Sequence, residues 1–308
     1  MEAAPYFADV AARDARAVWA RASDGARLRV ALWPEARARG TVVMFPGRTE
    51  YCEKYSDAAR EFGARGWAAA AVDWRGQGLA DRTGQARHVG HVDDFADFQR
   101  DVAAYLAVLE AEGFPKPFHL LAHSMGGLIG LRALVDHPVF ARAAFSAPMW
   151  GLPLAPGRRM TAFLLSRAGR TLGYGRHEVP ASGAQRDPVG QPFEGNLLTS
   201  DPAMFAWMKA QLAAHPDLAL GGPSLGWLWA ALGEMRDRAA RPAPDVPCLT
   251  LLGTEEGIVD AGAIMDRLDG WGDADLRLYD GARHEVLMEA PETRRAAFDA
   301  MDAHFGAG

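Results

Sequence analysis

One short stretch, residues 120–127, restricts the possible folds of this chain more than any other. It begins inside an apolar run, residues 118–122, that is typical of a buried strand, and it then changes to a pattern typical of a helix. Ser124 stands at the change, with the small residues Ala122 and Gly126 two positions away on either side. A sharp strand-to-helix turn needs small residues there, because bulky ones would collide with neighbouring backbone. The pattern therefore predicts a serine hydroxyl exposed over the end of a sheet.

Strand-like and helix-like segments alternate on both sides of this turn. Asp24-Gly25 favours a tight hairpin between the first two strands. Strands are expected at residues 18–21, 28–33, 41–45, 67–72, 118–122, 141–146, 248–252 and 275–279, and helices at 54–65, 95–109, 125–135, 261–268 and 291–305. Such alternation predicts an α/β fold, with a mostly parallel sheet covered by helices on both faces.

The alternation stops after Pro148 and resumes near residue 239. Between these points the sequence favours helices at residues 158–167, 202–214 and 225–238 and contains no convincing strand. We therefore predict one α/β core formed by residues 1–148 and 239–308, interrupted by an inserted helical cap at residues 149–238.

Composition excludes several classes of protein. The chain has 308 residues, 49% of them hydrophobic, which is ample for a globular core. Its formal net charge of −6 argues against a nucleic-acid partner, because no basic surplus is present to displace counterions. Two cysteines cannot form a disulfide framework, and no apolar run has the length of a signal peptide or a membrane span. We therefore expect a cytoplasmic protein; the sequence does not indicate its oligomeric state.

A serine hydroxyl becomes a nucleophile only with a base and an orienting acid, which follow it in the order acid, then histidine, in this architecture. His284 follows the last expected strand, at the sheet edge where Ser124 is expected, and is the candidate base. The loop after strand 248–252 contains Glu255, Glu256 and Asp260, and spacing alone does not choose between them. We favour Glu256, with Asp260 as the alternative acid, because Asp260 also fits the N-cap of the next helix.

The tetrahedral intermediate of acyl transfer also needs oxyanion donors. The expected donors are the backbone N–H of Met125, directly after the nucleophile, and that of Arg48, in the loop after the third strand. His123 neighbours Ser124, but its side chain should point away from the mouth of the site. We predict that His123 is a packed or hydrogen-bonded support and not a second base.

Several segments together carry a family resemblance: residues 46–51, 53–55, 73–78, 90–95, 122–127 and 283–285. With them the chain resembles the α/β-hydrolase superfamily, and within it bacterial lysophospholipases and monoacylglycerol lipases. Two positions depart from the family pattern: Pro46-Gly47 replaces the usual His-Gly, and the acid position falls on Glu256, where aspartate is usual.

The resemblance implies a serine carboxylic-ester hydrolase that acts on a small, lipid-like monoacyl ester, a lysophospholipid or a monoacylglycerol, through a Ser-His-acid triad and an acyl-enzyme. Two alternatives remain: an amide or aminoacyl-peptide hydrolase of the same fold, and a non-catalytic binding protein that has kept the fold. No cofactor is expected, because Arg75-Gly76-Gln77-Gly78 lacks the third glycine of a dinucleotide fingerprint. No metal is expected either, since His119 and His123 lie on a strand and a turn and not on one helical face.

The cap segment is rich in aromatic and basic residues. Most of its large apolar side chains should hold the cap to the core, while Trp150, Trp207 and Trp227 are candidates for lining an acyl pocket. Residues 149–177 include no Asp or Glu but have five arginines: Arg158, Arg159, Arg167, Arg170 and Arg176. Solvated arginines on the outer face of a helix explain this pattern as well as peripheral contact with the inner membrane surface does.

Overall fold

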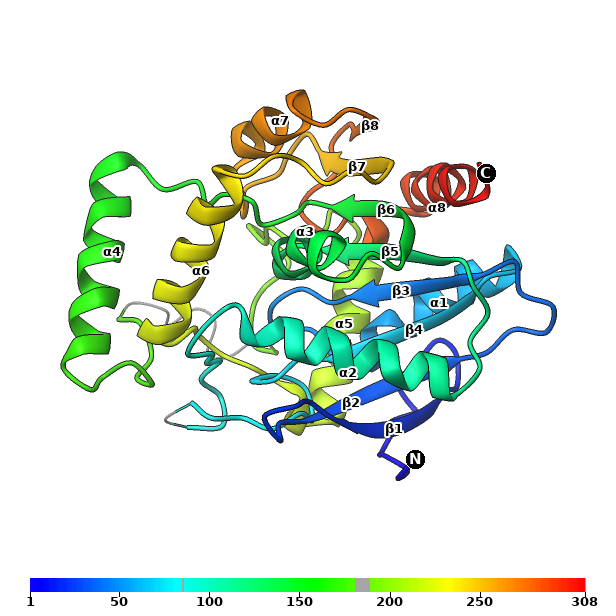
Figure 1. The fold of residues 1–308 in the computed structure, drawn as a ribbon, viewed down its shortest axis with the longest axis horizontal. Helices are drawn as coiled ribbons and strands as arrows, with labels where there is room; N and C mark the ends of the chain where they lie inside the picture. The colour runs from blue at the N-terminus through cyan, green and yellow to red at the C-terminus, as the bar shows by residue number, and fades with distance from the viewer. Residues whose placement is uncertain (85, 181–188, 308) are drawn as a thin grey trace.

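The computed structural model describes residues 1–84, 86–180 and 189–307. An eight-stranded sheet runs through it in the order β1-β2-β4-β3-β5-β6-β7-β8 (Figure 1). The β1–β2 and β2–β4 pairs are antiparallel, and the other neighbouring pairs are parallel. The predicted α/β fold with a mostly parallel sheet is therefore confirmed, and β5, which leads into Ser124, lies in its interior.

Each strand expected from the sequence is present. The strands are β1 (Arg16–Arg21), β2 (Arg27–Trp33), β3 (Thr41–Phe45), β4 (Ala68–Asp73), β5 (Phe118–His123), β6 (Phe140–Ser146), β7 (Cys248–Gly253) and β8 (Ala274–Tyr279). The α-helices are α1 (Ser56–Ala64), α2 (Asp97–Ala111), α3 (Met125–Asp136), α4 (Pro156–Thr171), α5 (Pro202–Ala214), α6 (Leu225–Ala239), α7 (Ala261–Asp269) and α8 (Pro291–Gly306). Short 3-10 helices are η1 (Cys52–Tyr55), η3 (Pro216–Leu218) and η4 (Val286–Met288).

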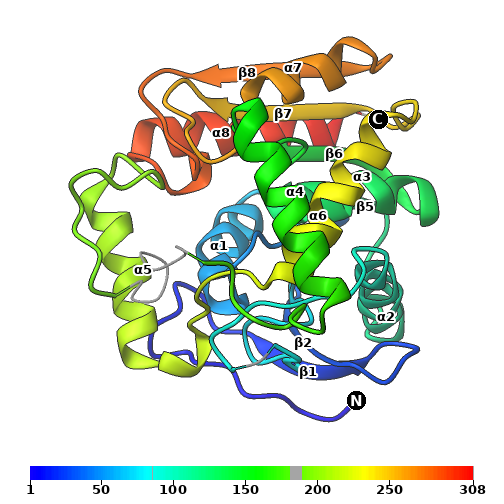
Figure 2. The same cartoon turned by 90° about the vertical axis from the view of Figure 1, so that its left-hand side faces the viewer.

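Helices cover both faces of the sheet. Helices α2 and α3 lie on one face and α1 and α8 on the other, as the two views show (Figures 1 and 2). Every residue of β3 and β5 is buried. Continuous apolar strands are stable here because neither face of the inner sheet meets water. None of the helices in the described ranges is both long and apolar enough to cross a bilayer.

Helices α4, α5 and α6 lie between β6 and β7 in the chain. The parallel strands point toward α4 and α6, which stand beyond that end of the sheet and pack on each other through Phe163 and Trp229, with ring centroids 4.9 Å apart (Figure 1). Helix α5 lies elsewhere, against η1, where Gln211 accepts a hydrogen bond from the Tyr51 hydroxyl at 3.0 Å. Helices α4 and α6 pack together, whereas α5 packs against η1. The prediction that residues 149–238 form a single cap therefore stays a prediction.

Candidate active site

Ser124 occupies a strained turn between β5 and α3. Its φ of 49° and ψ of −118° lie in a region that non-glycine residues rarely adopt, and such strain concentrates at functional sites. The turn is held by main-chain hydrogen bonds, because Ser124 N–H donates to the Ser146 carbonyl at 3.1 Å and the Ser124 carbonyl accepts from Gly127 and Met149, each at 2.8 Å. Ser124 as a whole residue is 8% exposed, and the exposure of its hydroxyl stays a prediction.

Close backbone packing explains the small residues around Ser124. A side chain at Gly126 would collide with the main chain of the loop after β3, since a Cβ there would lie 2.6 Å from the Pro46 carbonyl oxygen. A Cβ at Gly47, in the same loop, would lie 3.1 Å from the Ser124 Cβ. This packing places the loop after β3 directly against the candidate nucleophile and accounts for its reduced exposure.

His284 and Glu256 are hydrogen-bonded to each other. The His284 Nδ1 lies 2.8 Å from Glu256 Oε2, and both side chains are at most 4% exposed. The other carboxylate oxygen of Glu256 accepts from the N–H groups of Ile258 at 2.6 Å and Val259 at 3.0 Å. Burial raises the pKa of Glu256, but the His284 hydrogen bond and these N–H groups outweigh burial, and the net pKa is lowered. A carboxylate with a lowered pKa therefore holds His284 through Nδ1, so the other ring nitrogen, Nε2, is not used by Glu256.

The other two carboxylates of the same loop have different surroundings. Asp260 caps the N-terminus of α7, accepting from Gly262 N–H at 3.0 Å and Ala263 N–H at 3.2 Å. This N-cap was expected from the sequence and is confirmed. Glu255 is exposed to solvent. Of the three candidates, Glu256 is the one that the structure brings to His284.

Ser124 and His284 reach the same edge of the sheet. The ring of His123, which precedes Ser124, lies beside the ring of His284, with centroids 4.7 Å apart and planes inclined by 56°. His123 is itself 3% exposed, and its Nδ1 lies 3.0 Å from the Ser146 carbonyl oxygen. His123 is thus a hydrogen-bonded, packed residue, as the sequence indicated.

The two backbone groups expected to bind an oxyanion belong to segments that adjoin Ser124. Met125 begins α3, so its N–H belongs to the first turn, where no intrahelical acceptor is available. Arg48 follows Gly47 in the loop after β3. The sequence indicated only the backbone of Arg48, but its buried guanidinium donates to the Gly221 carbonyl and lies 5.5 Å from the Trp227 ring. Burial lowers the pKa of Arg48 to about 10.

The three tryptophans predicted to line an acyl pocket lie in three different places. Trp227 is buried beside Arg48, and Trp207 lies partly buried in a small apolar cluster formed mainly by α5 and Met288. Trp150 donates from Nε1 to the Gly127 carbonyl at 3.1 Å and stacks on Trp271. Their role in lining one acyl pocket stays a prediction.

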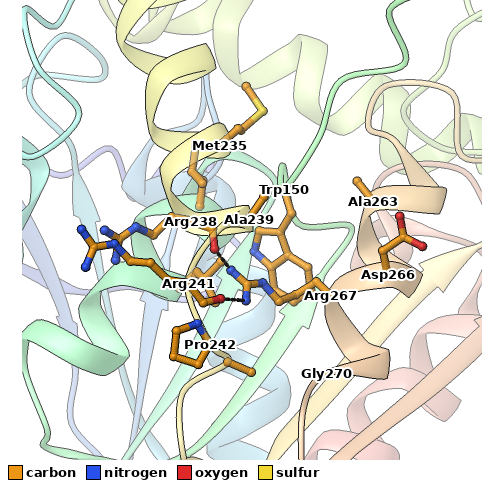
Figure 3. A pocket seen from close by; sticks show the side chains of 13 residues that line it. Trp150, Met235, Arg238, Ala239, Arg241, Pro242, Ala263, Asp266, Arg267 and Gly270 are labelled. Carbon is orange, nitrogen blue, oxygen red and sulfur yellow. Dashed lines mark hydrogen bonds between the residues drawn. The ribbon is translucent and has the colours of Figure 1, made fainter.

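Trp150 borders a cavity of about 310 Å³ between α3, α6 and α7 (Figure 3). Neither Ser124 nor His284 lines this cavity. Arg267 donates there to the carbonyls of Arg238 and Arg241 and so satisfies acceptors left at the end of α6. The Arg267 guanidinium is thus bonded to main-chain carbonyls at and just after the end of α6.

Comparison with known families identifies the chain. The family model described as serine aminopeptidase, S33 matches residues 36–291. The chain belongs to this family of α/β hydrolases. The S33 chain is 30% identical to the probable lysophospholipase L2 of Haemophilus influenzae over 88% of its own length and 85% of the relative's. It is 28% identical to the monoacylglycerol lipase of Mycolicibacterium smegmatis, covering 88% of this chain and 90% of that one.

Solved structures agree with the S33 assignment. A soluble variant of monoglyceride lipase from Saccharomyces cerevisiae, crystallised with a substrate analog, superposes with a TM-score of 0.73 at 21% identity and covers 97% of both chains. This likeness confirms the fold, and the family with its relatives confirms the resemblance drawn from the sequence motifs. The protein is a serine ester hydrolase.

Proposed function

We propose that the protein hydrolyses carboxylic esters of monoacyl lipids, lysophospholipids or monoacylglycerols, through Ser124, His284 and Glu256. The observation that carries the proposal is the hydrogen bond between Glu256 and His284 at the sheet edge where Ser124 forms a strained turn. The names of the relatives, lysophospholipase and monoacylglycerol lipase, support the substrate class.

In this mechanism Ser124 Oγ attacks the ester carbonyl while His284 Nε2 takes its proton. Glu256 fixes the imidazole tautomer and stabilises the imidazolium that forms. The backbone N–H groups of Met125 and Arg48 donate to the developing oxyanion. His284 returns the proton to the departing alcohol, and water, activated by the same imidazole, then hydrolyses the acyl-Ser124 ester.

The description of the S33 family as aminopeptidases favours one alternative, amide hydrolysis by the same triad. A panel containing a monoacylglycerol, a lysophosphatidylcholine and an aminoacyl p-nitroanilide separates the two. We expect kcat/KM for the better lipid ester to exceed that for the amide by about 100-fold or more, since differential transition-state binding sets such ratios. The reverse ranking would favour amide hydrolysis.

Exposed side chains distributed around α4 also support contact with a membrane. Helix α4 packs on α6 through buried Ser166 and Gly169. On and just after α4, large apolar side chains remain in solvent, including Met160 at 59%, Leu164 at 54% and Leu172 at 70% exposure. We call these residues and the neighbouring exposed arginines the docking face: Arg158, Arg159, Arg167 and Arg170. Exposed apolar groups among basic residues are typical of a helix that lies in an anionic lipid interface.

The docking face predicts a preference for anionic vesicles at low salt. Each basic residue near an anionic surface contributes about 1 kcal/mol, so Arg158→Gln/Arg159→Gln should weaken binding to phosphatidylglycerol vesicles by about 25-fold. Leu164→Glu should weaken binding to both anionic and neutral vesicles, because it places a charge in the apolar layer.

Co-sedimentation with phosphatidylglycerol and phosphatidylcholine vesicles measures these changes. Arg277→Gln, on the exposed edge strand β8, is the matched control and should bind like the unmodified protein. Equal binding to anionic and neutral vesicles at low salt would rule out the docking face.

A further inference from the structure

Four charged side chains form a buried cluster beside the proposed triad: Glu50, Lys54, His123 and Glu285. Their side chains are between 4% and 8% exposed. They come from three separated parts of the chain: the region after β3, the end of β5 and the loop after β8. Buried charges are costly unless they are paired, so this convergence needs an account.

The two carboxylates share the ammonium of Lys54. Lys54 Nζ donates to Glu50 Oε1 and, at 2.5 Å, to Glu285 Oε1. The second oxygen of Glu50 accepts from the Gly47 N–H and from the Tyr55 hydroxyl, the latter at 2.7 Å. Glu50 therefore holds the loop that contains Gly47 and Arg48, while Glu285 directly follows His284 in the chain.

The contacts of His123 define its protonation state. The Nδ1 atom lies 3.0 Å from the Ser146 carbonyl oxygen, which only accepts, so Nδ1 carries a proton. The Nε2 atom lies 3.4 Å from Glu285 Oε2 and 3.8 Å from Glu50 Oε1, and an unprotonated nitrogen there would face two carboxylates. Burial lowers the pKa of His123, but Glu285 and Glu50 outweigh burial, and the net pKa is raised. These contacts favour the imidazolium form of His123, whose positive charge, with that of Lys54, would balance two carboxylates.

The same groups resemble a metal site. The ligand atoms of Glu50, His123 and Glu285 lie within 4.8 Å of one another, close enough to hold an ion. Lys54, however, already binds an oxygen of each carboxylate. The ammonium and the imidazolium together supply the positive charge that the two carboxylates need.

We propose that this charge-balanced cluster positions the catalytic groups: Glu50 holds the oxyanion loop, Glu285 holds the loop of His284, and Lys54 with protonated His123 joins the two. The proposal rests on the triad proposed above. The four residues act as positioning residues, because they work through Gly47, the neighbouring Arg48 N–H and His284. Misplacement of reacting groups by about 1 Å can cost on the order of 100-fold in rate.

Lys54→Met tests the proposal, because it removes the shared cation at nearly constant side-chain length. We expect kcat for p-nitrophenyl butyrate to fall about 10- to 100-fold with KM within about threefold, since positioning acts on the transition state. Lys54→Arg, which can bridge both carboxylates, should recover most of the lost rate. Lys209→Met, which removes a partly buried lysine of α5 bonded to the Gln191 carbonyl, is the matched control and should keep normal kcat. A folded Lys54→Met enzyme with unchanged kcat would overturn the proposal.

A second measurement does not depend on catalysis or on the stability of Lys54→Met. In ¹⁵N spectra of the imidazole side chains, with His123 assigned from the signals lost in His123→Gln, both ring nitrogens of His123 should be protonated at pH ~7.5. A neutral His123 ring would overturn the proposal. The spectra can be recorded on Ser124→Ala, so failure of the cluster and failure of the triad are distinguished.

Discussion

Replacement of Ser124 by alanine is expected to lower kcat for ester hydrolysis by about a thousandfold or more and to abolish covalent labelling by a fluorophosphonate. The hydroxyl is the proposed nucleophile, and no acyl-enzyme can form without it. The oxyanion donors and the substrate site remain, so a small residual rate above the uncatalysed reaction is expected. Steady-state kinetics and gel-based labelling measure the two effects independently.

A matched serine-to-alanine change serves as the control. Ser166 is a buried serine of α4 whose hydroxyl donates to the Phe163 carbonyl of its own helix at 3.1 Å. Ser166→Ala should retain activity and labelling within about twofold, because such back-bonding contributes little to stability. Persistent labelling of a folded Ser124→Ala protein would refute Ser124 as the nucleophile.

Glu256→Gln is expected to lower kcat by about 10³- to 10⁴-fold, a loss comparable to that expected for Ser124→Ala. The glutamine oxygen would keep accepting from the N–H groups of Ile258 and Val259, which turns its NH₂ group toward His284 Nδ1. An amide donor there selects the tautomer with the proton on Nε2, and that nitrogen can no longer accept the serine proton. The loss of the negative charge also removes the stabilisation of the imidazolium.

Two companion variants identify the acid. Asp260→Asn should keep kcat within about twofold and stability nearly unchanged, because asparagine caps a helix N-terminus as well as aspartate does. Glu256→Asp keeps the charge but shortens the side chain, so its kcat should lie between those of Glu256→Gln and the unmodified enzyme. A larger loss in Asp260→Asn than in Glu256→Gln would transfer the proposed role to Asp260.

The choice between these carboxylates illustrates a limit of local patterns. Glu256 and Asp260 lie in one loop, and each is at a plausible distance along the chain from a following histidine. The N-cap role of Asp260 could be predicted from the sequence, because capping involves only the next three residues. The contact of Glu256 with His284 could not be predicted, because the two residues lie 28 positions apart and meet only when their loops fold at the sheet edge.

The buried charged cluster was also not predictable from local sequence patterns. Glu50, Lys54 and Glu285 all lie in segments that carried the family resemblance, yet nothing in the sequence indicated that they meet. The i,i+4 spacing of Glu50 and Lys54 is compatible with any exposed helical pair. Only their burial against His123 turns a common surface pattern into a charge-balanced core.

The order of strands and helices, the mostly parallel sheet and the sharp turn at Ser124 were predictable from the sequence alone. Those features follow from hydrophobic periodicity and from small residues near the turn, which act over a few neighbouring positions. Three features became apparent only in the tertiary structure. They are the contact of Glu256 with His284, the contacts of the Arg48 guanidinium and the mutual pairing of four buried charged groups. These outcomes depend on distances between side chains from distant loops, and such distances exist only once the sheet has brought the loops to one edge.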